Sequence, residues 1–216
     1  MSEGAAGGAG APQARLVCPA EHSGWLTMPG RGLIMSPRRI LRDLVHPGDT
    51  VVDLGCGPGF FTLPMAEMVG EGGSVIAVDL QAAMLERLGV RAERKGLAAR
   101  VRPHECAADS LGLGDDQADF ALAFWMVHEV PDAARFLGEV HAVLRGGASL
   151  LLVEPRGHVS AEAFARTEAA AVQAGMRPVA RPRVAFSRAV LLRRDQSPRR
   201  AAPPIVGVDR PTRRGA

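Results

Sequence analysis

The chain has 216 residues, of which 47% are hydrophobic and 23% charged, and this suffices for one full-sized core but not comfortably for two domains. Its longest apolar run, residues 120–127, is far short of the roughly 20 residues that span a membrane, and residues 1–14 lack the features of a secretory signal, so we expect a cytoplasmic protein. The net charge of +3 lies in residues 195–216, and the nearly neutral remainder argues against nucleic acid as a partner.

The composition along the chain predicts one domain between two tails. Residues 1–14 are rich in glycine and alanine, and residues 195–216 are rich in proline and arginine, so both segments are expected to be disordered. Residues 15–194 form the predicted domain, in which residues 15–48 supply an N-terminal lid and helix. The three cysteines have no close spacing, which favours neither a disulfide framework nor a metal site.

Between the tails, strand-like runs alternate with segments of helical period. A helix is expected to start at Ser36-Pro37 and to end before Pro47-Gly48, because a hydroxyl caps a helix and proline suits its first turn. The expected strands are residues 50–54, 74–79, 101–105, 119–124 and 149–154. The expected helices between them are residues 60–69, 81–95 and 160–174, together with a helix that Asp132 caps and that Gly146-Gly147 ends.

The alternation breaks near the end of the chain. Residues 177–183 and 188–194 are two strand-like runs separated by a short turn, and they are expected to pair as a hairpin. Strict alternation elsewhere implies parallel strands with helices on both faces. We therefore expect an α/β, three-layer Rossmann-like sandwich around a mostly parallel seven-stranded sheet with an antiparallel C-terminal hairpin strand.

A glycine-rich loop follows the first strand. It reads Asp53-Leu54-Gly55-Cys56-Gly57-Pro58-Gly59, and glycine at alternate positions lets the chain turn sharply and brings a ligand close to the backbone. Ligands of doubly wound sheets bind at such strand ends. The dinucleotide fingerprint would need a further glycine where Phe60 stands, whereas an acidic residue ahead of the glycines resembles motif I of the class I S-adenosylmethionine (SAM) dependent methyltransferases.

The resemblance covers residues 36–194 and is closest to the small-molecule branch that includes quinone C-methyltransferases. It implies that Asp53 and the loop residues Gly55, Cys56, Gly57 and Gly59 contact the methionine end of SAM. It implies further that Asp79, at the end of the second strand, binds the ribose and that Leu80 covers the adenine. Asp109 would receive the adenine amine, or it only belongs to a loop or cap.

The segment after the fourth strand is the expected acceptor side. His128 is the proposed general base, and Glu129 would orient or charge it. The alternative is that His128 bonds only to the loop backbone and that Glu129 caps the next helix. Trp125 is expected to line the acceptor pocket, or else to fill the core. His22 and Trp25 either contact the substrate from the lid or belong to a strap packed across the sheet.

These observations predict a SAM-dependent methyltransferase acting on a small molecule by in-line displacement, with no metal. The sequence lacks both the Pro-Pro-aromatic motif of exocyclic-amine nucleic-acid methyltransferases and a Pro-Cys nucleophile pair. Two alternatives remain open: a SAM-binding interaction module without catalysis, and a nicotinamide-dependent dehydrogenase.

Overall fold

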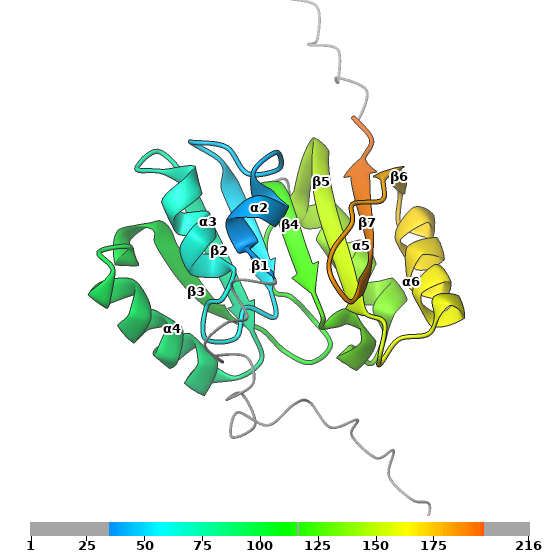
Figure 1. Ribbon diagram of the computed structural model, residues 1–216, viewed down its shortest axis with the longest axis horizontal. Helices are drawn as coiled ribbons and strands as arrows, with labels where there is room; N and C mark the ends of the chain where they lie inside the picture. Colours follow the sequence, from blue (N-terminus) through cyan, green and yellow to red (C-terminus); the bar gives the residue numbers. More distant parts are fainter. Residues whose placement is uncertain (1–34, 116, 197–216) are drawn as a thin grey trace, which may run out of the picture.

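The computed structural model describes residues 35–115 and 117–196, which build one seven-stranded sheet with helices on both faces (Figure 1). The order of the strands across the sheet is β3-β2-β1-β4-β5-β7-β6. The strands are β1 (Thr50–Leu54), β2 (Ser74–Asp79), β3 (Val101–Glu105), β4 (Ala118–Phe124), β5 (Leu144–Pro155), β6 (Met176–Ala180) and β7 (Ser187–Arg194). Only β7 runs antiparallel to both of its neighbours, which confirms the predicted fold class.

The described residues also form five α-helices and two short 3-10 turns, of which α2 precedes β1 and the others lie between strands. The helices are α2 (Pro37–Leu41), α3 (Thr62–Val69), α4 (Ala82–Arg94), α5 (Ala133–Val143) and α6 (Ala161–Gln173), and the turns are η2 (Ala98–Arg100) and η3 (Val127–Glu129). The side chains of Ser36, Asp132 and Ser160 each accept a hydrogen bond from a backbone N–H in the first turn of the helix that follows. Among the described residues, no helix is both long and apolar enough to cross a membrane.

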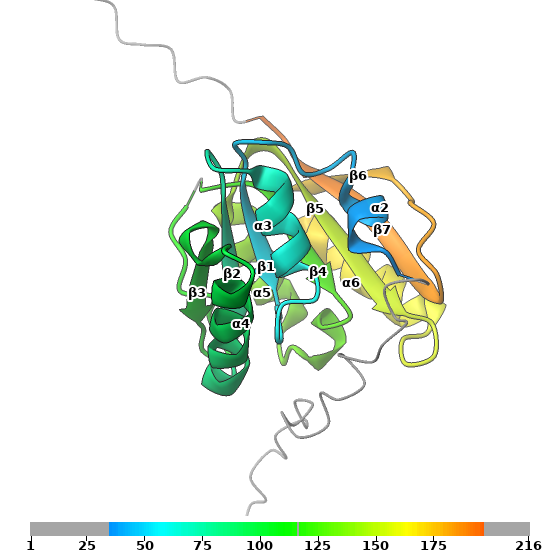
Figure 2. The same cartoon turned by 60° about the vertical axis from the view of Figure 1, so that its left-hand side comes forward.

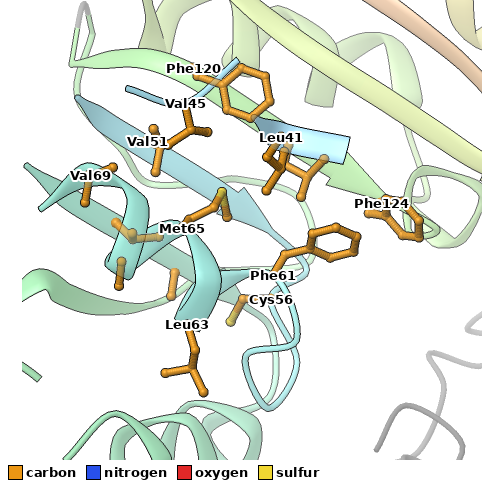
Figure 3. Packing of buried hydrophobic residues seen from close by; sticks show 14 of the residues in the cluster. Leu41, Val45, Val51, Cys56, Phe61, Leu63, Met65, Val69, Phe120 and Phe124 are labelled. Carbon is orange, nitrogen blue, oxygen red and sulfur yellow. The ribbon is translucent and has the colours of Figure 1, made fainter. Parts of the chain in front are cut away.

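The helices cover the two faces of the sheet in separate groups. α2, α3 and α4 pack on one face, and α5 and α6 on the other (Figures 1 and 2). Successive strand residues point to opposite faces, so Val51 belongs to the first core and Val52 to the second. In Figure 3, Leu41 of α2 and Met65 of α3 converge with Phe120 of β4 in the first core.

Several of the expected boundaries are wrong, among them the end of β6, which lies at Ala180 and not at residue 183. The helix of α2 is regular only to Leu41, and residues 42–44 form a turn instead of a further helical turn. The glycines at 146 and 147 do not end α5; the helix ends at Val143, and β5 starts immediately at Leu144, which pairs with Ala118. The pairing with β4 then shifts from Leu144 to Ser149, so the two glycines lie in an irregular part of β5 and not at the end of a helix.

The register of the parallel strands gathers their carboxyl ends at one edge. Asp53 of β1 lies beside Ala77 of β2 and Leu122 of β4, so the loops that leave these strands emerge together. Because β7 is antiparallel to β5, its first residue, Ser187, pairs with Pro155 at the same edge. The sheet thus brings the glycine-rich loop and the segments after β2, β4 and β5 to one place.

The predicted tail 1–14 and most of the predicted lid, residues 15–34, lie outside the described residues. So does most of the predicted tail 195–216, of which only residues 195 and 196 are described.

Candidate functional site

The glycine-rich loop after β1 is held against the end of β2. The backbone N–H groups of Gly55 and Cys56 both donate to the carbonyl oxygen of Val78, each at 2.9 Å. Gly55, Gly57 and Gly59 all have positive φ angles, of 69°, 52° and 89°. This is the backbone region that side chains disfavour, so the spacing of the glycines is a conformational requirement of the loop.

Two of these glycines also permit close packing. A Cβ atom at Gly55 would lie 3.0 Å from Cβ of Met126, in the segment after β4, and one at Gly59 would collide with Leu88 of α4. A Cβ atom at Gly57, in contrast, would meet nothing within 4 Å. The loop therefore packs tightly at both ends and borders open space at its middle glycine.

Asp79 ends β2 and connects that strand to the loop. Its side chain is nearly buried, with 9% of the residue exposed. Oδ2 accepts from the N–H of Gly57 at 2.8 Å, and Oδ1 accepts from the N–H of Gln81 at 2.9 Å. Burial raises the pKa of Asp79 above its ordinary value. A carboxylate has about four acceptor positions, so each oxygen keeps capacity for one more donor, such as one hydroxyl of a vicinal pair.

Asp53 lies deeper than Asp79 and has a different partner. Oδ2 of Asp53 accepts from the hydroxyl of Thr62 at 2.6 Å, which joins β1 to the start of α3. Burial raises the pKa of Asp53 to about 7, while the Thr62 hydrogen bond lowers it and the charge of Asp79 raises it further. Asp53 therefore titrates near neutral pH in this structure.

The other residues expected at the cofactor site differ in exposure. Cys56 is buried in the core between the loop and α3 (Figure 3), and burial raises the pKa of its thiol, so the sulfur is not suited to act as a nucleophile. Leu80 is 37% exposed beside Asp79. The side chain of Asp109 is 75% exposed and faces Nη1 of Arg135 at 3.5 Å.

Trp125 leaves the end of β4 in a strained conformation, with φ of 61°. Two hydrogen bonds hold it: its backbone N–H donates to the carbonyl of Val153 at 2.8 Å, and indole Nε1 donates to Oγ of Ser187 at 2.9 Å. Its ring lies 5.3 Å from that of Phe124, which in turn lies 4.4 Å from the ring of Phe61. A row of aromatic rings thus runs from the start of α3 to the segment after β4.

His128 lies in the 3-10 turn η3, two residues beyond Met126. Its Nδ1 lies 2.7 Å from Oε2 of Glu154, at the carboxyl end of β5, and its backbone N–H donates to Oε1 of the same carboxylate at 3.0 Å. Glu129, the expected partner, is more distant, with Oε1 4.0 Å from Nε2 of His128. The hydrogen bond with Glu154 raises the pKa of His128, and burial opposes this effect.

Sequence reasoning missed Glu154. The available signal was a carboxylate directly after four apolar residues of a buried strand, where an ionisable group is expensive unless it is paired. His22 and Trp25 lie outside the described residues. Among the residues that are described, no group of three His, Cys, Asp or Glu side chains could hold a metal ion.

Comparisons with known proteins agree with this geometry. The sequence profile of the methyltransferase domain family matches residues 51–147, from β1 into β5. Over these residues the chain is similar to that family. The matched segment contains the glycine-rich loop, Asp79 and His128, but it ends before Glu154.

The chain is also similar to two bacterial methyltransferases. The chain is 32% identical over 130 residues to a 2-phytyl-1,4-naphtoquinone methyltransferase from Nostoc sp., covering 60% of this chain and 56% of the relative. It is 30% identical over 121 residues to the ubiquinone/menaquinone biosynthesis C-methyltransferase UbiE from Francisella tularensis, covering 56% and 48%. The chain thus spans about half the length of the curated relatives it matches.

A solved structure shares the fold of this chain. A SAM dependent methyltransferase from Aquifex aeolicus superposes with a TM-score of 0.74 at 24% identity, over 81% of this chain and 98% of that one. At this identity the similarity establishes the class I fold, and the chemistry must be argued from the residues.

Proposed function

We propose that this chain is a SAM-dependent methyltransferase that methylates a small-molecule acceptor, with a quinone-type molecule as the first candidate. The observation that carries the proposal is the carboxylate of Asp79, nearly buried and joined to Gly57 at 2.8 Å. Asp79 and the glycine-rich loop thereby form one binding surface. The quinone candidate rests on the names of the two relatives.

The residues present fit SAM in charge and shape. Asp79 keeps acceptor capacity on both oxygens for the ribose hydroxyls, and Leu80 is exposed beside it for an apolar contact with adenine. The absence of a side chain at Gly57 opens the loop where a ligand must approach the backbone. SAM, when bound, supplies an activated methyl group for in-line displacement.

The remaining task of the protein is to align the acceptor and to remove its proton. Trp125 is held by its bond to Ser187 and supplies a fixed aromatic surface against which a flat acceptor can pack. His128 is the proposed general base, because its ring is a quarter exposed and the hydrogen bond with Glu154 raises its pKa, which makes the ring a stronger base. A hydroquinone that loses a proton becomes a better carbon nucleophile.

Substitution of Asp79 tests the cofactor assignment. We expect Asp79→Ala to weaken SAM binding by about 100-fold, because two charge-assisted hydrogen bonds are lost and the Gly57 N–H loses its acceptor. Isothermal titration calorimetry measures the affinity. Asp195→Ala, an exposed carboxylate at the opposite edge of the sheet, serves as the control and should bind SAM as the unmodified chain does.

Three outcomes separate the alternatives. Unchanged affinity in Asp79→Ala would refute the assignment, and tighter binding of NAD than of SAM by the unmodified chain would favour a dehydrogenase. Binding of SAM without release of S-adenosylhomocysteine, tested with reduced 1,4-naphthoquinone and a small-metabolite extract, would favour the non-catalytic module.

A further inference from the structure

The carboxylate of Glu154 is buried near the end of β5, where an ionisable side chain is unusual. Glu154 follows four successive residues of β5 that are fully buried, and only 1% of Glu154 itself is exposed. Burying a carboxylate is costly unless charge or hydrogen bonds compensate for the lost water. Glu154 therefore needs partners, and its partners indicate its role.

Both oxygens of Glu154 are directed at one residue. Oε1 accepts from the backbone N–H of His128 at 3.0 Å, and Oε2 lies 2.7 Å from Nδ1 of the same ring. An ionised carboxylate can only accept, so Nδ1 must carry a proton in this contact. In the neutral ring, Nε2 then holds the lone pair. The His128 side chain is 25% exposed, so the ring is accessible while its partner is sealed from water.

The other titratable or charged groups around His128 are less suited to hold its ring. Glu129, in the same turn, is 4.0 Å from Nε2 and its side chain is 34% exposed. His158, in the loop after β5, has its ring 6.2 Å from that of His128. On β7, Arg188 lies opposite Glu154 in the register, but its guanidinium donates to the carbonyl of Val159 at 2.7 Å.

We propose that Glu154 is the positioning residue of the acceptor site: it fixes the tautomer of His128 that carries hydrogen on Nδ1 and holds Nε2 ready to accept a proton from the methyl acceptor. The proposal rests on the proposed function for the identity of the reaction, but not for the state of the ring. In the proton balance, the acceptor loses one proton to Nε2, the ring becomes imidazolium, and Glu154 stays ionised and stabilises that cation.

The state of the ring can be measured without any activity. Nitrogen chemical shifts from the NMR spectrum of the 15N-histidine-labelled protein distinguish the two tautomers. We expect the tautomer with hydrogen on Nδ1 in the unmodified protein, and a His128 with hydrogen on Nε2 would overturn the proposal. This measurement needs no variant, so it remains decisive even if substitution of Glu154 prevents folding.

The variant Glu154→Gln keeps the size of the side chain and removes its charge. We expect the pKa of His128 in an NMR titration to fall by at least about one unit, a tenfold change in proton affinity. Glu129→Gln is the matched control and should shift the pKa by less than about 0.3 units, because this carboxylate is more distant and more exposed. If Glu154→Gln folds and the pKa of His128 is unchanged, the proposal is wrong, and the role of Glu154 is limited to anchoring the turn η3.

Kinetics connect the ring to the reaction. His128 must be neutral to act as a base, so kcat/KM rises with pH through its pKa. In Glu154→Gln the rising limb should move to lower pH by the same amount as the measured pKa, and the plateau should fall by about tenfold, because the base is weaker and less well held. A uniform loss at every pH, with no shift of the limb, would contradict the proposal. Absence of SAM binding by the unmodified chain would instead refute the proposed function.

Discussion

Two aspartates at neighbouring strand ends have different environments. Asp53 ends up inside the protein with Thr62 as its hydrogen-bond partner, whereas Asp79 accepts two backbone N–H groups at the edge of the site. Asp53 is 3% exposed and has a pKa of about 7, so it is in part protonated at neutral pH. Its contact with Thr62 secures the start of α3 beneath the loop. The implied contact of Asp53 with SAM stays a prediction.

The raised pKa of Asp53 predicts a pH-dependent stability. A carboxyl group whose folded-state pKa is raised contributes stability below its ordinary value of 3.8, and this contribution is lost as pH rises through about 7. Asp53→Asn keeps an acceptor for Thr62 but cannot ionise. We expect the free energy of unfolding of this variant to increase relative to the unmodified protein between about pH 4 and pH 7.

Urea denaturation across that pH range measures the effect, in the absence of SAM, whose charge would alter the titration. Asp195→Asn, with an exposed carboxylate, should show no such trend. A constant difference between Asp53→Asn and the unmodified protein at all pH values would contradict the raised pKa.

At the scale of elements, the loop after β1 combines two kinds of glycine. Gly59 is needed for packing, because Leu88 of α4 occupies the place of its side chain, and Gly57 borders open space. Both have positive φ angles. Gly59 therefore lets the loop pack against the core, and Gly57 leaves space beside the loop for a ligand.

Substitution of Gly59 should mainly lower the stability of the protein, whereas substitution of Gly57 should mainly weaken SAM binding. We expect Gly59→Ala to lower the free energy of unfolding by about 2 to 3 kcal/mol, because the methyl group overpacks against Leu88 in a strained backbone. Gly57→Ala should lower the free energy of unfolding by only about 1 kcal/mol, because alanine is strained at this positive φ angle. It should nevertheless weaken SAM binding by at least about tenfold. Urea denaturation and calorimetry separate the two effects. Equal loss of stability in both variants, or full SAM affinity in Gly57→Ala, would contradict this division.

The bounds of some strands follow from the local sequence, whereas the bounds of others depend on the strands with which they pair. β1, β2 and β3 have the predicted ends, and in β1 and β2 short runs rich in β-branched residues mark the strand. β5 is longer than predicted, because Leu144 already pairs with Ala118 of β4, ahead of the regular pairing with β4 and β7 that begins at Ser149. A local sequence rule does not include such partners.

At the scale of the whole molecule, the sheet separates two apolar cores. Leu122 of β4 contributes to the core under α2, α3 and α4, while its neighbour Ala123 faces the core under α5 and α6. β4 lies between β1 and β5, so both of its edges are paired, and the two cores cover both of its faces. The segment that carries Trp125 and His128 therefore follows a strand that is buried on both faces.

Removing side-chain volume from this centre should be costly. Leu122 is fully buried, and we expect Leu122→Ala to lower the free energy of unfolding by about 2 to 5 kcal/mol through the lost burial and the cavity left behind. Val90→Ala on the outer surface of α4, where valine is 47% exposed, should change it by less than about 0.5 kcal/mol. Urea denaturation measures both, and a loss below about 1 kcal/mol in Leu122→Ala would show that the centre of the sheet is not tightly packed.

The sequence by itself determined the class of fold, the glycine-rich loop and the place of Asp79. These follow from periodicity, from glycines at positions of positive φ and from a carboxylate at a strand end, all of which are local properties. The predicted roles of Leu80 and Asp109 in binding SAM remain predictions, as do those of His22 and Trp25, which lie outside the described residues.

Only the tertiary structure decided which side chains meet. Glu154 is 26 residues from His128 and Ser187 is 62 residues from Trp125, and each contact depends on the register of β5 with β4 and of β7 with β5. A shift of one residue in either register would turn these side chains to the other face of the sheet. The partner of His128 was therefore not available from local pattern, because it is fixed by the pairing of strands that are separate in the chain.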